Sequence, residues 1–172
     1  DGWHGDAAIT VAVGEVEPAV LELMRITEES MWQGFAAARL GGNVGDISHA
    51  IESYVTSQPH PSGGSFGILR DYTGHGIGTE MHQPPNVPNF GKPGKGPKLR
   101  RGLALAVEPM ITLGSRDTVV AEDEWTVITA DGSMSAHFEH TFTLTPQGPW
   151  ILTALDGGEE RLAAMGVPFG GR

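Results

Sequence analysis

Two glutamates stand inside runs that otherwise have the pattern of buried β-strands, and no other feature restricts the fold as strongly. In LALAVE, residues 103–108, strand alternation places the large apolar side chains on one face and Glu108, with two alanines, on the other. In AHFEHTF, residues 136–142, both phenylalanines share one face, while Glu139 shares the other with His137 and Thr141. A buried carboxylate is costly unless it meets a cation or takes up a proton. Each glutamate therefore has to find a cation or take up a proton if it is buried.

Two further groups extend this pattern. His75 lies between two glycines in DYTGHGIG, residues 71–78, which has the character of an extended strand. Asp6 stands at the start of an apolar strand, in HGDAAIT. We expect His75 and the three carboxylates to converge on one sheet.

Each of these residues also has a purely structural interpretation. An aspartate before a strand is usually a turn residue, and a glutamate on an edge strand is usually solvated. A histidine near glycines is more often a hydrogen-bonded structural group than a ligand. Because two glutamates lie within strands, a metal site and these structural interpretations have about equal weight at this point.

The first part of the chain predicts a strand and two helices. The strand covers 7–13, and the helix after it begins near Pro18 and ends at Gly41. A second amphipathic helix starts at Asn43, with Asp46 in capping-box spacing, and stops at a pair of prolines.

The second part predicts mainly strands. They are separated by a long loop rich in proline and glycine over 83–102 and by an Asp131-Gly132 turn. The predicted strands are 103–113, 124–130, 136–145 and 150–152. Two helices followed by mostly antiparallel strands place the chain in the α+β class, and 172 residues fit one domain.

Composition excludes several kinds of chemistry. The formal charge of −10 argues against a general nucleic-acid or membrane binder, because both partners are anionic. The absence of cysteine excludes disulfides, thiolate metal sites and a cysteine nucleophile. Some of the acidity is therefore available to face metal ions.

Taken together, the motifs resemble those of type I methionine aminopeptidases. In chain order they are DGWHGDAAIT, then GHGIG with His82 seven residues after His75, then AVEPMITLG, and then EWTVITADGSMSAHFEHTFTLT. The resemblance covers the chain from Asp1 to about Thr153. The short interval between Glu108 and Glu139 is similar to type I and lacks the long helical insertion of type II.

The resemblance implies the α+β pita-bread fold, a mostly antiparallel curved sheet with helices packed on its outer face. It implies that Asp6 and Glu139 bridge two divalent metal ions and that His75 and Glu108 bind one of them. Carboxylate-rich ligation with one imidazole admits Co, Mn, Fe or Zn. The glycines beside His75 would let backbone and substrate approach the imidazole, whose free nitrogen must reach a metal.

The implied reaction removes the initiator methionine of nascent proteins whose second residue is small, using a water that the metal ions activate. By resemblance, His82 hydrogen-bonds the scissile carbonyl and Glu108 carries the proton to the leaving amine. Met81 and Trp125 match positions of the methionine pocket, and Met81 stands where phenylalanine is common in the family.

The family has one more metal-binding aspartate, about one strand-length upstream, which would lie before Asp1. We therefore interpret the chain as the C-terminal, metal-bearing portion of such an enzyme, with its N-terminal half incomplete. The catalytic domain is expected over 1–153, with 154–172 as a tail of the same domain. Three carboxylates do not neutralise two divalent ions, so the 172-residue chain alone is expected to hold at most one ion tightly and to be nearly inactive.

Three other functions stay open. An X-Pro aminopeptidase or prolidase of the same fold would keep the metal ligands and change the flanking motifs, whereas the EPM and EWTVIT blocks favour the methionine enzyme. A non-catalytic pita-bread module that binds proteins would lose ligands by substitution. The third alternative is that the chain is an isolated fragment that has no function.

The loop Lys92–Arg101 holds five of the eleven basic residues: Lys92, Lys95, Lys98, Arg100 and Arg101. A solvated flexible loop is the ordinary interpretation, and contact with ribosomal RNA near emerging chains is the alternative. The resemblance otherwise implies a cytoplasmic monomer that acts on N-terminal methionine peptides and has no membrane contact.

Overall fold

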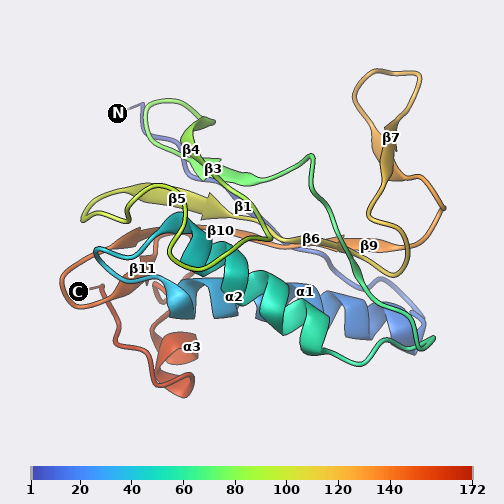
Figure 1. Ribbon diagram of the computed structural model, residues 1–172, viewed down its shortest axis with the longest axis horizontal. Helices are drawn as coiled ribbons and strands as arrows, with labels where there is room; N and C mark the ends of the chain where they lie inside the picture. Colours follow the sequence, from blue (N-terminus) through green and yellow to red (C-terminus); the bar gives the residue numbers. More distant parts are fainter. Residues whose placement is uncertain (1, 172) are drawn as a thin grey trace.

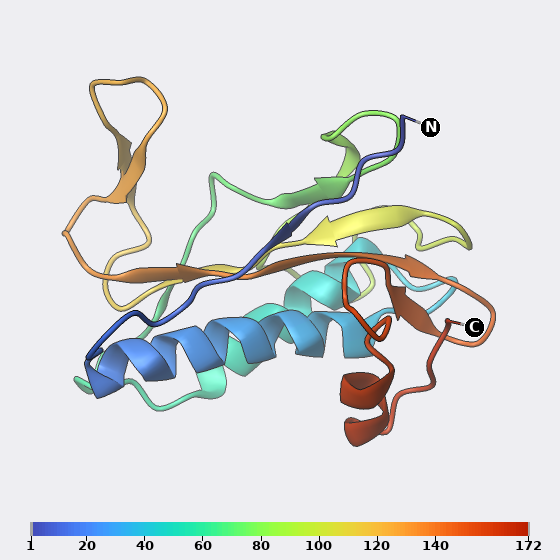
Figure 2. The ribbon, with the colours of Figure 1, turned by 180° about the vertical axis from the view of Figure 1, so that it is seen from behind.

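The computed structural model describes residues 2–171 and has all its helices on one side of an antiparallel sheet (Figure 1). The two long helices, α1 (Pro18–Ala37) and α2 (Val44–Ser57), lie side by side beneath the sheet in both ribbon views (Figure 2). The short helix α3 (Glu159–Ala164) lies on the same side. The α+β class predicted from the sequence is confirmed. None of the helices within residues 2–171 has the length and apolar content needed to cross a lipid bilayer.

The helix boundaries follow local signals. Proline occupies the first turn of α1, where its missing N–H costs no hydrogen bond. At the start of α2 the Asp46 carboxylate accepts the backbone N–H of Asn43 at 2.7 Å, which is the acidic arm of the predicted capping box. Both helix predictions are confirmed.

Six strands form the larger sheet, in the order β1-β10-β5-β3-β4, with β11 paired to β10. All of these pairs are antiparallel. The strands are β1 (Ala7–Ala8), β3 (Gly74–Gly76), β4 (Gln83–Val87), β5 (Ala104–Val107), β10 (Glu139–Leu144) and β11 (Pro149–Ile151).

A second sheet of three strands continues the larger one, in the order β2-β6-β9. Its strands are β2 (Gly67–Ile68), β6 (Met110–Thr112) and β9 (Ser135–His137). A hairpin of β7 (Thr118–Val120) and β8 (Val127–Thr129) pairs with itself and projects away from both sheets (Figure 1).

Two of the predicted strands are each divided between the two sheets. The strand predicted over 103–113 is broken at Glu108-Pro109 into β5 and β6, and that predicted over 136–145 is broken at Phe138 into β9 and β10. Proline has no N–H to donate, which favours a break in the ladder. Both glutamates therefore lie at the junction of the sheets rather than in the middle of a strand.

Other strand boundaries also differ from the prediction. The strand predicted over 7–13 has only two residues in the ladder, and β4 occupies part of a segment predicted as loop. Beyond β1, the side chains of Ile9, Val11 and Val13 alternate along the chain and are between 64% and 83% exposed. This segment, residues 9–13, is an apolar margin at the edge of the sheet.

The core consists of two apolar clusters between the helices and the sheets. The larger one contains Phe35 and Phe142, whose ring centroids are 5.1 Å apart. The smaller one joins Leu23 and Ile26 of α1 to the three-stranded sheet. Leu162 of α3 belongs to the larger cluster, so the last part of the chain packs on the same core.

The basic loop Lys92–Arg101 is attached to α2 through its backbone. The Asp46 carboxylate accepts the N–H of Gly94 at 2.7 Å, and the Val44 N–H donates to the Pro97 carbonyl at 2.9 Å. The Lys98 ammonium donates to the Gly41 carbonyl at 3.0 Å. The lysines are exposed, as the solvated-loop interpretation requires, but the backbone is held in place by these bonds.

Candidate metal centre

The strand register brings the predicted site residues to the face of the sheet opposite the helices. His75 of β3 is paired with Ala106 of β5, and Ala106 is paired on its other side with Thr141 of β10. Directly opposed residues in antiparallel strands share a face, as do residues two apart along a strand. Glu108 and Glu139 therefore share that face with His75, as the alternation in the sequence predicts.

The glycines on both sides of His75 are required by neighbouring backbone. A Cβ atom at Gly74 would lie 2.3 Å from the Ala106 carbonyl oxygen, and one at Gly76 would lie 2.3 Å from the Pro84 carbonyl oxygen. No side chain fits at either position without moving a strand. The expectation that these glycines admit backbone is confirmed, and the approach of substrate stays a prediction.

The His75 imidazole is buried in the tautomer that suits a metal ligand. Its Nδ1 lies 3.0 Å from the carbonyl oxygen of Gly76, and because a carbonyl can only accept, Nδ1 carries the hydrogen. The lone pair of Nε2 is then free. Nε2 lies 3.3 Å from Oε1 of Glu108 and 3.8 Å from Oδ2 of Asp6. A hydrogen bond that fixes the second nitrogen in this way is usual for metal-binding histidines.

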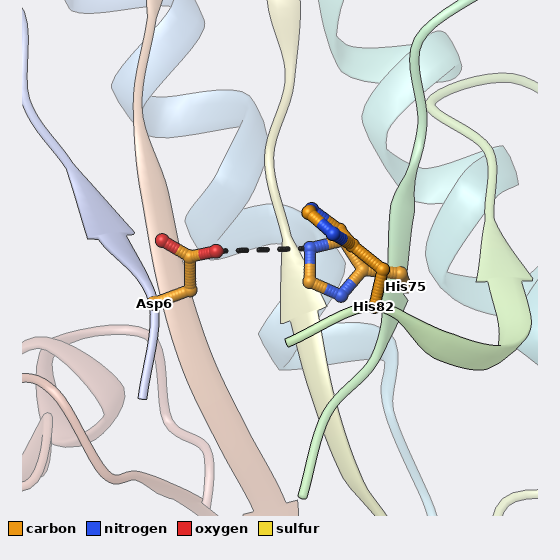
Figure 3. A group of neighbouring side chains, drawn as sticks. All are labelled: Asp6, His75 and His82. Atoms are coloured by element: carbon orange, nitrogen blue, oxygen red, sulfur yellow. Dashed lines mark ion pairs between the residues drawn. The ribbon is translucent and has the colours of Figure 1, made fainter. Parts of the chain in front are cut away.

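Two overlapping groups of side chains have their ligand-type atoms within 4.8 Å of one another. One group is His75, Glu108 and Glu139, and the other is Asp6, His75 and His82. Figure 3 shows Asp6 on one side of β10 and β5 and the two histidines on the other, with Asp6 directed toward His75. The two imidazole rings meet edge to face, with centroids 4.3 Å apart.

Glu139 lies in an environment where a bound cation would offset the cost of its buried negative charge. It is 4% exposed, and its Oε1 is buried without a hydrogen-bond partner among residues 2–171. Burial, followed by the negative charges of Glu108 and Asp6, raises the pKa of its carboxyl to about 8. Hard carboxylate oxygens with one imidazole are a ligand set suited to a divalent metal ion, so the residues present fit the expected metal.

The Asp6 backbone is fixed by one residue that the sequence did not single out. Its N–H donates to the Thr141 hydroxyl at 3.0 Å, and that hydroxyl donates to the Asp6 carbonyl at 2.9 Å. Strand alternation had already placed Thr141 on the polar face, so a signal for it was present. By contrast, Asn89, which donates to the Glu108 carbonyl at 3.0 Å, comes from a proline-rich segment with no pattern that indicates it.

His137 is a second residue that the sequence placed on this face without a role. Its Nε2 lies 3.5 Å from Oε2 of Glu108. That nitrogen is buried and has no hydrogen-bond partner within residues 2–171.

The two predicted pocket residues have different positions. Met81 is adjacent to His82 and is 38% exposed, so it stands at the margin of the candidate site. Trp125 is 87% exposed and lies in the turn of the β7–β8 hairpin, apart from the metal-ligand groups. The structure thus brings together Asp6, His75, His82, Glu108 and Glu139 but not Trp125, whose part in substrate binding stays a prediction.

Comparison with known proteins gives a consistent family. Metallopeptidase family M24 matches residues 1–146. Methionine aminopeptidase 1 of Mycobacterium tuberculosis is 52% identical over 153 residues, which make up 89% of this chain and 58% of that protein. The methionine aminopeptidase of Clostridium acetobutylicum is 46% identical over 153 residues, covering 89% of this chain and 59% of the relative.

Solved structures agree with the sequence relatives. The methionine aminopeptidase of Thermotoga maritima superposes with a TM-score of 0.83 at 45% identity, over 88% of this chain and 59% of that one. A dipeptidase of Pyrococcus horikoshii, 19% identical with a TM-score of 0.66, shares the fold alone. The pita-bread fold expected from the sequence is confirmed, and the chain spans about three-fifths of the length of the curated relatives it matches.

Proposed function

Since the chain belongs to metallopeptidase family M24, we propose that its polar face holds the catalytic metal of a methionine aminopeptidase. The ligands are Asp6, His75, Glu108 and Glu139. The observation that carries the proposal is the buried Glu139 carboxyl, which has an unpartnered oxygen and lies beside two acidic groups and the free Nε2 of His75. A divalent cation balances this charge, whereas no positively charged lysine or arginine side chain pairs with these carboxylates in residues 2–171.

When bound there, a divalent ion would act as a Lewis acid and lower the pKa of a water at the site. The residues of the chain supply the other requirements. Glu108 is 14% exposed at its side chain, which leaves it accessible to accept a proton and pass it to the leaving amine. His82 is exposed at the margin of the cluster, where its imidazole can donate a hydrogen bond to the scissile carbonyl.

The number and identity of the ions belong to the same proposal. Asp6, His75, Glu108 and Glu139 would hold the ions, which are Co, Mn, Fe or Zn, and we propose two ions in the whole protein but one held tightly by this chain alone. The two ligand groups share His75 and bring Asp6 and Glu139 together from neighbouring strands, so the four proposed ligands lie in one cluster.

The proposed substrate is a peptide that starts with methionine and has a small second residue. Support comes from relatives named methionine aminopeptidase, which are 41% to 52% identical over most of this chain. The X-Pro aminopeptidase and prolidase structures are 18% to 23% identical and support the fold alone. We also propose that the protein is a cytoplasmic monomer. Contact of the loop Lys92–Arg101 with ribosomal RNA is a further proposal, supported by the exposed lysines of a loop whose backbone is held in place.

A chimaera tests the proposed reaction. This chain replaces the matching 59% of the Thermotoga maritima enzyme, and cleavage of Met-Ala-Ser and Met-Gly peptides is compared with cleavage of X-Pro peptides, beside the chain assayed alone. The chimaera should release methionine and leave X-Pro peptides intact. Glu139→Ala in the chimaera should lose activity and metal together. Cleavage of X-Pro peptides alone would replace the proposal with the prolidase function.

A further inference from the structure

The two oxygens of the Glu108 carboxylate face different imidazoles. Oε1 lies 3.3 Å from Nε2 of His75, and Oε2 lies 3.5 Å from Nε2 of His137. The first imidazole belongs to the candidate metal ligands, while the second has no place in the proposed reaction so far. Each oxygen of the Glu108 carboxylate therefore has a different imidazole as its neighbour.

His137 is held firmly enough to act on Glu108. It is the last residue of β9 and is paired with Met110 of β6, two residues after Glu108. The Thr10 hydroxyl donates to the His137 carbonyl at 2.7 Å and accepts the His137 N–H at 3.0 Å. The backbone of Glu108 is fixed in turn by the hydrogen bond from Asn89. The backbone of each residue is therefore fixed beside the other by these hydrogen bonds.

The chemistry of the contact defines which nitrogen carries the hydrogen. A carboxylate only accepts hydrogen bonds, so a buried nitrogen facing it is favourable when it bears a hydrogen and repulsive when it presents a lone pair. His75 has the opposite arrangement: its Nδ1 hydrogen is given to Gly76, and its Nε2 lone pair faces Oε1, a repulsion that a bound divalent cation would relieve. The two imidazoles beside Glu108 therefore suit different roles: His137 can donate a hydrogen bond, and His75 can bind a metal.

Building on the proposed metal centre, we propose that His137 is a positioning residue whose Nε2 hydrogen bonds to Oε2 of Glu108 and leaves Oε1 to face the metal. The 3.5 Å separation is at the limit of a hydrogen bond. Holding one oxygen favours ligation of the metal through the other oxygen alone. It also keeps the Glu108 carboxylate in a single orientation for its part in proton transfer.

Titration of the 172-residue chain with Co²⁺ alone tests this role. His137→Leu removes the hydrogen-bond donor, whereas His137→Gln keeps an N–H near the position of Nε2. We expect the leucine variant to bind Co²⁺ about 10- to 100-fold more weakly, as is typical when a partner of a metal ligand is lost, and to change the visible spectrum of bound Co²⁺. The glutamine variant should keep both the affinity and the spectrum. His49→Leu, on the exposed face of α2, is the matched control and should leave both unchanged.

The unmodified protein provides a test that needs no variant. Long-range ¹H–¹⁵N NMR of the metal-free and Zn²⁺-loaded chain identifies the tautomer of each histidine. We expect hydrogen on Nε2 of His137 and on Nδ1 of His75. Hydrogen on Nδ1 of His137, or direct ligation of Zn²⁺ by His137, overturns the proposal, as does equal Co²⁺ affinity of the leucine variant and the wild type.

These outcomes are distinguishable from failure of the proposed function. If the protein were not a methionine aminopeptidase, the chimaera would leave methionine peptides intact, while the His137 tautomer and the Co²⁺ comparison would still give their answers. If the cluster bound no metal at all, the wild type would show no Co²⁺ spectrum, and the positioning role of His137 would be overturned together with the metal centre.

Discussion

Glu139 couples folding to pH because its carboxyl group is buried next to Glu108 and Asp6. These surroundings raise its pKa from 4.5 to about 8. In the unfolded chain the group releases its proton near 4.5, whereas in the folded chain it keeps the proton up to about 8. The contribution of this group to stability is thus full below about 4.5 and is lost as the pH rises toward about 8.

We therefore expect the metal-free chain to lose unfolding free energy between these pH values, on the order of a few kcal/mol, and to regain it with a divalent ion. Urea unfolding in EDTA and in Mn²⁺, at a series of pH values, measures this. Glu139→Gln cannot ionise and should remove this decrease in unfolding free energy. Burial lowers the pKa of His140 and acts in the opposite direction, so the decisive comparison is between wild type and this variant. Equal decreases in the two proteins would contradict the prediction.

The glycines of GHGIG provide a second prediction at the residue scale. Gly76→Ala should destabilise the chain by roughly 2 kcal/mol or more, because the new methyl group meets the backbone oxygen of Pro84 at 2.3 Å. Gly64→Ala is the control, since its Cβ would have ordinary contacts with His60 at 3.6 Å. Thermal unfolding of both variants measures the difference. A Gly76 variant as stable as the control would show that β3 and β4 separate without cost.

At the scale of elements, the helices were predictable because their signals are local. Pro18, Asn43 and Asp46 mark helix starts wherever the rest of the chain lies. The strand breaks at Pro109 and Phe138 were not predicted, because they depend on which neighbouring strands each half joins. Strand alternation predicted that Asp6, His75, Glu108 and Glu139 converge on one sheet, whereas their role as metal ligands was implied by the family resemblance. The contact between His137 and Glu108 was not, because it joins β9 to the end of β5 across the junction of two sheets.

The packing of α1 against the sheet gives a prediction for the larger core cluster. Phe35 is fully buried, with Trp32 edge to face at 5.5 Å between ring centroids and Phe142 tilted at 5.1 Å. Phe35→Ala should cost about 3–5 kcal/mol of unfolding free energy. Leu21→Ala, on the exposed face of the same helix, should cost less than about 1 kcal/mol. Chemical denaturation separates the two, and similar losses would mean that α1 is not anchored through this ring.

At the scale of the whole molecule, the two ligand groups limit how many ions the chain can hold tightly. Both groups include His75, so one ion that takes its Nε2 removes that ligand from the other group. We expect one tightly bound divalent ion per 172-residue chain, and none in His75→Ala. Elemental analysis after dialysis gives the ratio. Two ions retained by the wild-type chain would show that Asp6 and the other carboxylates suffice for the second.

The apolar margin at residues 9–13 has a consequence for the colloidal behaviour of the chain in solution. Three exposed branched side chains next to a short edge strand attract other hydrophobic surfaces, while the formal charge of −10 keeps molecules apart. Charge repulsion reaches about 10 Å in 0.1 M salt and about 3 Å in 1 M salt, whereas hydrophobic attraction does not fade in this way. Light scattering of the purified chain should therefore increase with sodium chloride, and Ile9→Lys with Val11→Lys should suppress the increase. Storage in buffer of low ionic strength would then keep the wild-type protein dispersed.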